Sequence, residues 1–285
     1  LSPLARPHAV SSGASVLESD DLEGSRTGLR SGYGQSKWVA EKLLFEARAR
    51  GYPCTIIRPG YIVGDTQTGV TNTDDFLWRL VKGCIQLGEV PIMNNVVNMC
   101  AVDYVARVVV EAARQPSALS KGVFHVDNPH RFRYNDFFDQ LRIYGYGVNP
   151  VAYIPWRNHL MDVTLRSADN ALYPLLHFVL DDLPTSTKSP ALDISHTLAL
   201  CEAAGVTCSP MSSLIGLYLA YLVKSGFLPP PPEAAQVESE VALIMGGRDT
   251  PVASEPTETR KVVPRRSLPK LNIEVTSQLN RSDRG

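Results

Sequence analysis

The sequence has no apolar run long enough to cross a membrane. The richest run, residues 214–227, is interrupted by Lys224 and falls short of the roughly 20 residues that a membrane-spanning helix needs. Near the first residue, Pro3 and Pro7 interrupt the segment where a secretory signal would have its apolar core. We therefore expect a protein without a membrane partner.

The sequence also has little net charge and no recognisable metal-binding pattern. The formal net charge is -1 at pH 7, whereas a protein that binds nucleic acid usually has a strongly basic face. The five cysteines include no C-x-x-C pair, and the six histidines show no metal-ligand spacing. This favours buried thiols in a reducing compartment over disulfides or zinc ligation. We expect a cytoplasmic protein that binds neither nucleic acid nor a metal ion.

What the sequence does contain is a regular alternation of helix and strand patterns. Amphipathic helices and short apolar strands follow one another in the first half, at residues 34–50, 54–57, 74–87, 96–102, 103–114, 122–126 and 134–144. This alternation predicts an α/β fold with a parallel sheet. From about residue 151 the patterns are mostly helical. From residue 233 the chain is polar with scattered prolines, which predicts disorder.

The helix predicted at residues 34–50 has an apolar stripe at near-helical spacing, formed by Trp38, Val39, Leu43, Leu44 and Ala47. Such a stripe usually packs against the core of the domain. We therefore expect these side chains to face inward, and the charged residues between them, including Glu41, to face solvent.

Polar residues precede two of the predicted helices. We expect Asn72 or Thr73 to cap the helix at 74–87, and Asp103 to cap the helix that follows it. Asp74 and Asp75 allow two interpretations. They are acidic residues in a first helical turn, where the helix dipole favours negative charge, or they contribute to a binding site.

Tyr33 and Lys37 stand four residues apart in the stretch Tyr33-Gly34-Gln35-Ser36-Lys37. At this spacing two side chains project from the same face of a helix. A tyrosine hydroxyl can donate a proton to a reacting carbonyl oxygen, and a nearby ammonium stabilises the phenolate that results. The pair therefore predicts a proton-transfer site. The alternative is the ordinary surface start of a helix.

Arg58, Pro59 and Gly60 follow the apolar strand predicted at 54–57. A Pro-Gly pair marks a turn by itself, so one interpretation is a simple end of the strand. The position of this turn after the first strand that follows Lys37 favours a second interpretation, in which its backbone borders a cofactor.

Two stretches carry a family resemblance, Gly32-Tyr33-Gly34-Gln35-Ser36-Lys37-Trp38 and Ile57-Arg58-Pro59-Gly60-Tyr61-Ile62-Val63-Gly64. They resemble the extended short-chain dehydrogenase/reductase family. Further stretches, among them residues 72–77 and 171–177, are similar to the carboxy-terminal thioester reductase domains of fungal L-2-aminoadipate reductases. The resemblance implies the carboxy-terminal part of a Rossmann-like reductase fold. The change of sequence pattern after residue 150 and the proline run at 229–232 divide the chain into a partial core at 1–150, a mostly helical substrate-side cap at 151–230 and a disordered tail at 231–285.

The resemblance also implies roles for single residues. Tyr33 would be the general acid that protonates the oxygen of the reduced carbonyl. Lys37 would support Tyr33 and hold the ribose hydroxyls of the cofactor, so that both residues contact it. Pro59, Gly60 and Ile62 would form the backbone wall behind the nicotinamide ring.

The implied reaction is the NADPH-dependent reduction of a 2-aminoadipyl thioester to 2-aminoadipate 6-semialdehyde, a lysine precursor. Asn72 and Asp74 would lie near this substrate. The substrate would be held on the phosphopantetheine arm of a carrier domain. The implied partners are that carrier domain and an upstream adenylation domain of a larger multidomain enzyme.

The sequence departs from the resembled family in one important feature. The glycine-rich turn G-x-x-G-x-x-G, which holds the cofactor pyrophosphate, does not precede Tyr33. We therefore expect the chain to be the carboxy-terminal half of a reductase domain and, when isolated, to bind NADPH poorly. The active-site Ser or Thr of the family is expected upstream of residue 1, with Ser11 or Ser12 as the alternative. Two other functions stay open: an extended reductase acting on a nucleotide sugar, and a truncated inactive fragment that only binds or scaffolds.

Overall fold

The structure, a computed structural model, describes residues 15–29, 32–116, 122–176, 179 and 191–232. Ser11 and Ser12 lie outside these residues, as does nearly all of the tail predicted at 231–285. The chain divides into two units, Leu1–Ala242 and Leu243–Gly285, and everything described below belongs to the first.

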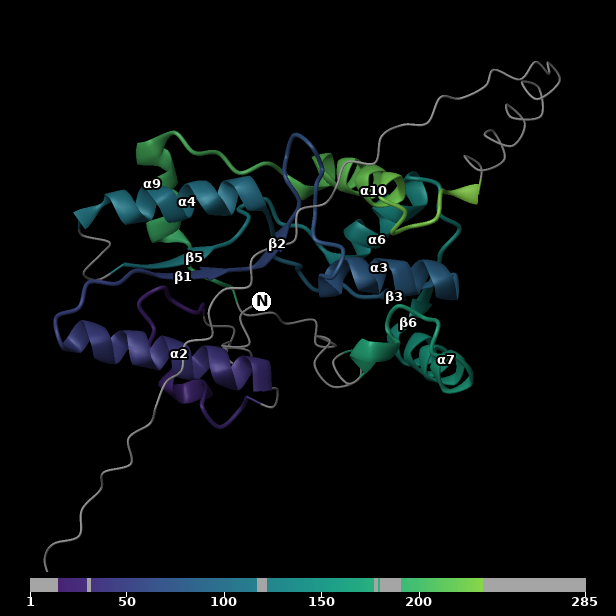
Figure 1. The fold of residues 1–285 in the computed structure, drawn as a ribbon, viewed down its shortest axis with the longest axis horizontal. Helices are drawn as coiled ribbons and strands as arrows, with labels where there is room; N and C mark the ends of the chain where they lie inside the picture. Colours follow the sequence, from purple (N-terminus) through teal and green to yellow (C-terminus); the bar gives the residue numbers. More distant parts are fainter. Residues whose placement is uncertain (1–14, 30–31, 117–121, 177–178, 180–190, 233–285) are drawn as a thin grey trace, which may run out of the picture. The chain divides into compact units, whose positions relative to one another are not determined.

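Helices and strands alternate along the described chain (Figure 1). In chain order they are η1 (Leu22–Ser25), α2 (Gly32–Ala49), β1 (Ile56–Pro59), β2 (Tyr61–Val63), α3 (Phe76–Leu87), β3 (Glu89–Ile92), β4 (Met99–Ala101), α4 (Val102–Arg114), β5 (Val123–Val126), α6 (Tyr134–Ile143), β6 (Asn149–Ala152), α7 (Tyr153–Arg166), η2 (Tyr173–Leu175), α9 (Ser195–Ala204), η3 (Met211–Ser213) and α10 (Ile215–Lys224). The prediction of an α/β fold is confirmed.

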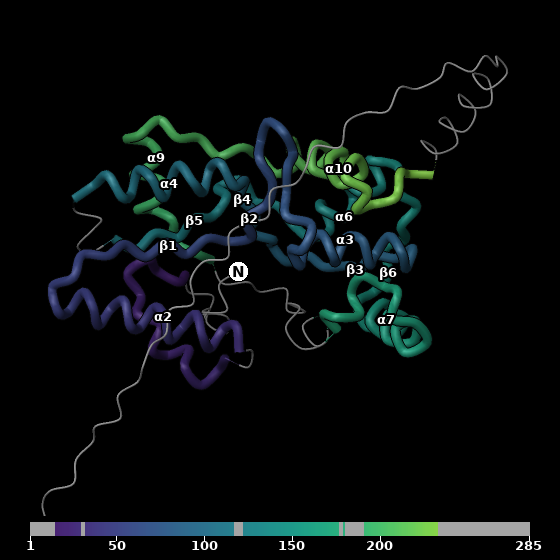
Figure 2. Tube along the Cα trace, viewed as in Figure 1, coloured from purple at the N-terminus to yellow at the C-terminus, as the bar shows by residue number. Residues whose placement is uncertain are grey.

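All the paired strands are parallel, in the pairs β1–β5, β2–β4 and β3–β6. Figure 2 shows β1 continuing into β2. At the junction, Gly60 N donates to Val126 O (3.1 Å) beside β5, whereas Tyr61 N donates to Asn98 O (2.7 Å) beside β4. The chain therefore changes its partner strand at Gly60, which the sequence pattern indicated only as the end of a strand.

Helices cover the β1–β5 pair from both sides. Figure 1 shows α2 on one side of these strands and α4 with α9 on the other. A second part of the core lies where α3, α6 and α10 meet. There the buried ring of Trp78 contacts Phe137 and Tyr218 edge-on, with centroids 6.1 and 5.9 Å apart. Such edge-to-face pairs add to the burial of large apolar surfaces.

Both predicted helix caps are wrong. Asp75 caps α3, because its Oδ1 accepts from Leu77 N (2.9 Å), and the helix begins two residues later than predicted. Helix α4 begins at Val102 without a side-chain cap, and Asp103 lies in its first turn. Its Oδ2 accepts from the hydroxyl of Thr66 at 2.6 Å. At α4, the bond from Thr66 in the loop after β2 holds the carboxylate that was predicted as the cap.

The predicted orientation of α2 is also wrong for one charged residue, Glu41. Among the described residues of α2, those that are buried are Gly34 and Glu41, while Val39 and Leu43 are 49% and 64% exposed. Glu41 is buried because Arg58 on β1 offers it a counter-charge. The helical period alone cannot reveal such a distant partner.

The chain after residue 150 is mostly helical, as predicted, with differences at the level of single elements. The strand predicted at 151–154 is β6, two residues earlier, and it pairs with the unpredicted β3. The described part of the helix predicted at 168–183 contains the short turn η2. Helix α9 packs against α4 and β5, and the domain boundary at residue 150 stays a prediction.

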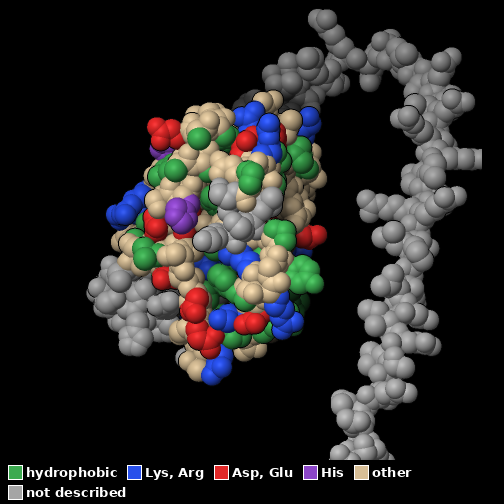
Figure 3. Space-filling view, turned by 90° about the vertical axis from the view of Figure 1, so that its left-hand side faces the viewer, with side chains coloured by type: hydrophobic (Ala, Val, Ile, Leu, Met, Phe, Trp, Pro, Cys, Tyr) green, Lys and Arg blue, Asp and Glu red, His purple; other side chains and the backbone are tan. Residues whose placement is uncertain are grey.

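The described part of the chain shows no disulfide, no membrane-spanning helix and no cluster of metal ligands. Cys84, Cys100 and Cys201 are buried, and all five cysteines are free thiols. In the described part of the chain, no helix has the length and apolar character to cross a membrane, and no cluster of three or more His, Cys, Asp or Glu is placed to hold a metal ion. On the face shown in Figure 3, basic and acidic side chains are interspersed, so neither sign of charge dominates it.

Candidate active site

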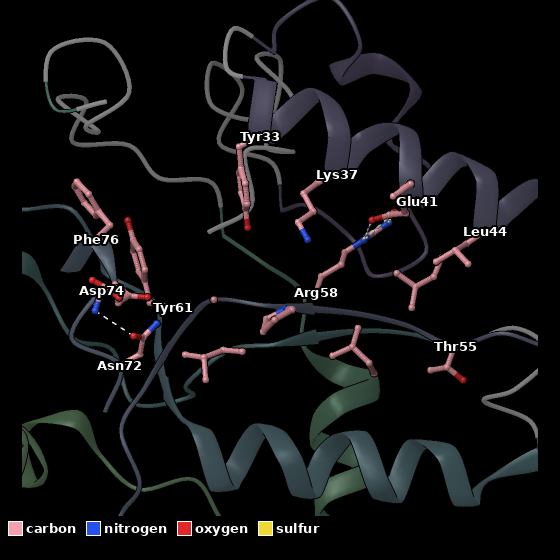
Figure 4. A pocket seen from close by; sticks show the side chains of 17 residues that line it. Tyr33, Lys37, Glu41, Leu44, Thr55, Arg58, Tyr61, Asn72, Asp74 and Phe76 are labelled. Carbon is pink, nitrogen blue, oxygen red and sulfur yellow. Dashed lines mark hydrogen bonds and ion pairs between the residues drawn. The ribbon is translucent and has the colours of Figure 1, made fainter. Parts of the chain in front are cut away.

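A cavity of about 720 Å³ lies between α2, the β1–β2 segment and the loop before α3. All seven residues predicted for the site line it, namely Tyr33, Lys37, Pro59, Gly60, Ile62, Asn72 and Asp74. They come from α2, the β1–β2 segment and the loop before α3, and Figure 4 labels Tyr33, Lys37, Asn72 and Asp74 among them. The fold thus brings together the residues that were predicted separately. Their individual roles stay predictions.

Tyr33 and Lys37 project from α2 into this cavity (Figure 4). The Nζ atom of Lys37 lies 5.6 Å from the centroid of the Tyr33 ring, within the range of a cation–π contact. Tyr33 is 67% exposed, so a substrate has access to it. The hydroxyl of Ser36 donates to Tyr33 O at 2.8 Å within the first turn of α2. The pair therefore has the geometry expected of a proton donor with a neighbouring cation.

The opposite wall is the backbone of Pro59 and Gly60. Gly60 is packed so closely against the residue before β4 that an added Cβ would lie 2.5 Å from the backbone oxygen of Asn98. A wall of backbone without large side chains suits a flat ring, and the Lys37 ammonium opposite can donate to ribose hydroxyls. The residues present thus fit the nicotinamide end of a cofactor.

We expect Gly60→Ala to destabilise the protein by about 1–3 kcal/mol, because the new methyl group overpacks against backbone that cannot rotate away. Urea unfolding followed by circular dichroism measures the change. Gly216→Ala is the matched control, since a Cβ there meets nothing within 4 Å and alanine favours a helix such as α10 by about 0.5–1 kcal/mol. A Gly60→Ala protein as stable as wild type would contradict the close packing.

The third wall is the loop that leads into α3. Asn72 Oδ1 accepts from Asp74 N (3.1 Å), and Asp74 forms an ion pair with Arg79 (2.7 Å) while its side chain is 80% exposed. Asp75 also lines the cavity, and burial raises the pKa of its carboxyl. Asn72 and Asp74 are therefore placed beside the cavity, with Asp74 already paired to a cation.

The cavity is also lined by polar side chains to which the sequence patterns assigned no role, among them Glu41, Arg58 and Tyr61. Glu41 stands four residues after Lys37, and Arg58 directly precedes Pro59. The spacing of Tyr33, Lys37 and Glu41, one helical turn at each step, was the available signal. Tyr61 is set apart by its surroundings, because burial, with a smaller effect of Tyr134, raises the pKa of its hydroxyl well above the ordinary value.

Outside the cavity, Asp127 follows the last residue of β5. Burial raises the pKa of its carboxyl from 3.8 to about 6, although the N–H of Asn128 opposes this by donating to Oδ1. The folded protein therefore binds this proton more tightly than the unfolded chain does. The stabilising contribution is complete below about pH 4 and is lost as the pH rises through about 6.

We expect Asp127→Asn to raise the free energy of unfolding at about pH 8 by about 1–3 kcal/mol, since each pKa unit is worth about 1.4 kcal/mol. The amide keeps the Oδ1 acceptor and removes the buried charge. Urea unfolding at several pH values should show the gain shrinking towards zero near about pH 4. The exposed Asp162, on α7, provides the control variant Asp162→Asn. A gain that does not depend on pH would contradict this account.

Comparisons with known proteins show which proteins this chain resembles. Residues 5–109 match the family model described as "Male sterility protein". The L-2-aminoadipate reductase large subunit of Penicillium chrysogenum is 45% identical over 260 residues, which cover 83% of this chain and 18% of that protein. The L-2-aminoadipate reductase of Saccharomyces cerevisiae is 41% identical over 252 residues, 81% of this chain and 18% of the relative.

A solved structure decides the fold. The terminal R domain of the myxalamid PKS-NRPS pathway is 36% identical, with a TM-score of 0.70 over 76% of this chain and 55% of that domain. The described residues have the fold of this R domain over the part that they match. The chain spans only part of the length of this R domain and of the curated relatives. The described fold is therefore one portion of what these proteins contain.

Proposed function

We propose that this chain is the part of a thioester reductase that holds the nicotinamide and the substrate carbonyl. The enzyme would reduce a 2-aminoadipyl thioester, carried on phosphopantetheine, to 2-aminoadipate 6-semialdehyde with NADPH. The observation that carries the proposal is a cavity that Tyr33 and Lys37 face from α2, in a chain 45% identical to an L-2-aminoadipate reductase.

Each wall of the cavity has a part in this chemistry. Bound NADPH supplies a hydride to the thioester carbonyl carbon. Tyr33 donates its proton to the carbonyl oxygen, which gives a hemithioacetal, and the nearby ammonium of Lys37 stabilises the phenolate left on Tyr33. Collapse of the hemithioacetal breaks its C–S bond and transfers the hydroxyl proton to the leaving sulfur, which frees the thiol of the carrier arm and releases the aldehyde.

The wider setting belongs to the same proposal. The partners are the carrier domain that holds the thioester and an adenylation domain that activates the amino acid, both within a larger cytoplasmic enzyme of lysine biosynthesis. A linear gramicidin synthase of Brevibacillus parabrevis, 37% identical over 216 residues and matched over 4% of its length, supports a place within a large synthase.

The test is a turnover assay with the full-length protein that contains this chain. We expect loss of NADPH absorbance with the pantetheine thioester of 2-aminoadipate, release of an aldehyde that a hydrazine reagent traps, and no reaction with free 2-aminoadipate. Turnover of a nucleotide sugar in place of the thioester would overturn the proposal in favour of that alternative. Absence of turnover with every substrate would favour a chain that only binds or scaffolds.

A further inference from the structure

Polar contacts, more than apolar packing, attach α2 to the rest of the described structure. Among the described residues of α2, Gly34 and Glu41 are buried, and Gly34 has no side chain. Two further contacts lie along the helix: Trp38 Nε1 donates to Leu22 O, and Arg48 Nε donates to Cys54 O, both at 2.8 Å. The position of the helix that carries Tyr33 and Lys37 thus depends on a few directional bonds.

The strongest of these contacts is the ion pair between Glu41 and Arg58. Arg58 Nη2 lies 2.5 Å from Glu41 Oε1, and Arg58 Nε lies 3.1 and 3.3 Å from the two carboxylate oxygens. Both residues are only 8% exposed. A fork-shaped guanidinium on a carboxylate fixes direction as well as distance. This pair therefore sets how α2 is rotated over β1.

Arg58 is itself held from its other side. Its Nη1 lies 2.9 Å from His125 Nε2, and its two terminal nitrogens donate to the backbone oxygens of Glu18 (3.4 Å) and Asp20 (3.0 Å). His125 Nδ1 lies 2.8 Å from Asp193 O, a carbonyl that can only accept, so Nδ1 carries the proton and Nε2 accepts from Arg58. Burial lowers the pKa of His125, which keeps this ring neutral.

The support extends to the strand beyond β1. The carboxylate of Glu18, fully buried, accepts from His125 N at 2.8 Å, from His196 N at 2.7 Å and from the Thr197 hydroxyl at 3.0 Å. It thereby ties β5 and the start of α9 to the segment that supplies carbonyls to Arg58. These bonds fix the orientation of the Arg58 guanidinium independently of α2. Its Nε and Nη2 groups are thereby directed towards the Glu41 carboxylate.

We propose that Glu41 and Arg58 are positioning residues for the reduction, which hold Tyr33 and Lys37 at their working distance from β1. Tyr33, Lys37 and Glu41 follow one another at intervals of four residues on one face of α2, and all three line the same cavity as Arg58. A rotation of α2 that the ion pair prevents would swing the phenol and the ammonium along the cavity together. The inference rests on the function proposed above.

The test compares Glu41→Gln, Glu41→Asp and Arg58→Lys in the full-length protein. Glutamine removes the charge at constant shape, aspartate keeps it one methylene short, and lysine keeps the cation without its fork. Because small misplacements of reacting groups are costly, we expect kcat to fall about 10- to 100-fold in Glu41→Gln and in Arg58→Lys. In the same variants the KM for NADPH should rise, and Glu41→Asp should recover part of both losses.

Glu23→Gln is the matched control. Glu23, in η1, forms an ion pair with Lys42 of α2 at 3.1 Å, but the Glu23 side chain is 49% exposed. Exposed ion pairs contribute little to stability. The kcat of this variant should stay within about twofold of wild type. Amide hydrogen exchange gives a readout independent of activity: α2 should exchange faster in Glu41→Gln, while α4 keeps its wild-type protection.

Each outcome decides the matter. Faster exchange in α2 together with lower kcat supports the proposal, and lower kcat with unchanged exchange in α2 overturns it. Wild-type kcat in folded Glu41→Gln or Arg58→Lys protein overturns it, whether or not exchange changes. If either variant fails to fold, Glu41→Asp takes its place, and a wild-type kcat there overturns the proposal equally. If wild type reduces no thioester, the proposed function has failed, while exchange of α2 still shows whether the ion pair fixes this helix.

Discussion

Replacing Tyr33 with phenylalanine should lower the rate of reduction by about 10²- to 10⁴-fold, the usual contribution of a positioned general acid. The variant loses one oxygen and its proton, and keeps the ring that lies beside Lys37. The proton is donated as charge develops on the carbonyl oxygen, so the loss concerns the transition state far more than the ground state. The affinity for NADPH should therefore stay nearly unchanged.

The measurement is kcat for the pantetheine thioester of 2-aminoadipate, together with the Kd for NADPH from fluorescence titration, in the full-length protein. Tyr52→Phe is a matched control, because Tyr52 follows α2 closely and has the same exposed fraction as Tyr33, 67%, but does not line the cavity. Near-normal turnover of Tyr33→Phe would remove Tyr33 from the chemistry. A large rise in Kd would assign it to binding instead of proton transfer.

Replacing Lys37 with alanine should impair both binding and rate. The ammonium at this position can donate to the ribose hydroxyls of the cofactor and stabilise the phenolate of Tyr33. Losing charge-assisted hydrogen bonds of this kind should weaken NADPH binding about 10- to 100-fold, and kcat should fall as well. This pattern differs from that of Tyr33→Phe, in which kcat falls and the affinity is preserved.

The same titration and turnover assay measure both effects. Lys82→Ala is a suitable control, because Lys82 also lies over an aromatic ring, with its Nζ 4.7 Å from the centroid of Phe227, at a place outside the cavity. If Lys37→Ala bound NADPH as wild type does and lost only rate, Lys37 would act on Tyr33 alone. Unchanged binding and unchanged rate would exclude Lys37 from the site.

Most of the candidate site could be predicted from the sequence, because each of its parts is a short local pattern. Tyr33 and Lys37 share a helical face by their spacing alone, and Pro59 with Gly60 marks the end of β1 by its own backbone chemistry. The structure places these groups around one cavity. What could not be predicted is that Gly60 is a switch point, where the chain leaves β5 for β4, because parallel pairing joins segments far apart in the sequence.

The errors in the predicted elements have a similar origin. Asn72 was a reasonable cap on its own, but its Oδ1 accepts from Asp74 N, and Asp75 provides the cap of α3 instead. Asp103 was expected to cap α4, and it bonds to Thr66 in a loop that precedes it by many residues. At α3 several neighbouring polar side chains could serve as the cap, whereas at α4 the loop after β2 binds the carboxylate that was expected to cap the helix.

The sequence alone determined the periodicities of this protein: which residues form helices and strands, and which side chains share a face with Tyr33 and Lys37. Only the tertiary structure decided which face of α2 turns inward. The apolar stripe with Val39 and Leu43 predicted one orientation, whereas the described structure buries Glu41 against Arg58. The physical reason is that a carboxylate can be buried when a guanidinium compensates its lost hydration. That guanidinium comes from another element of the fold.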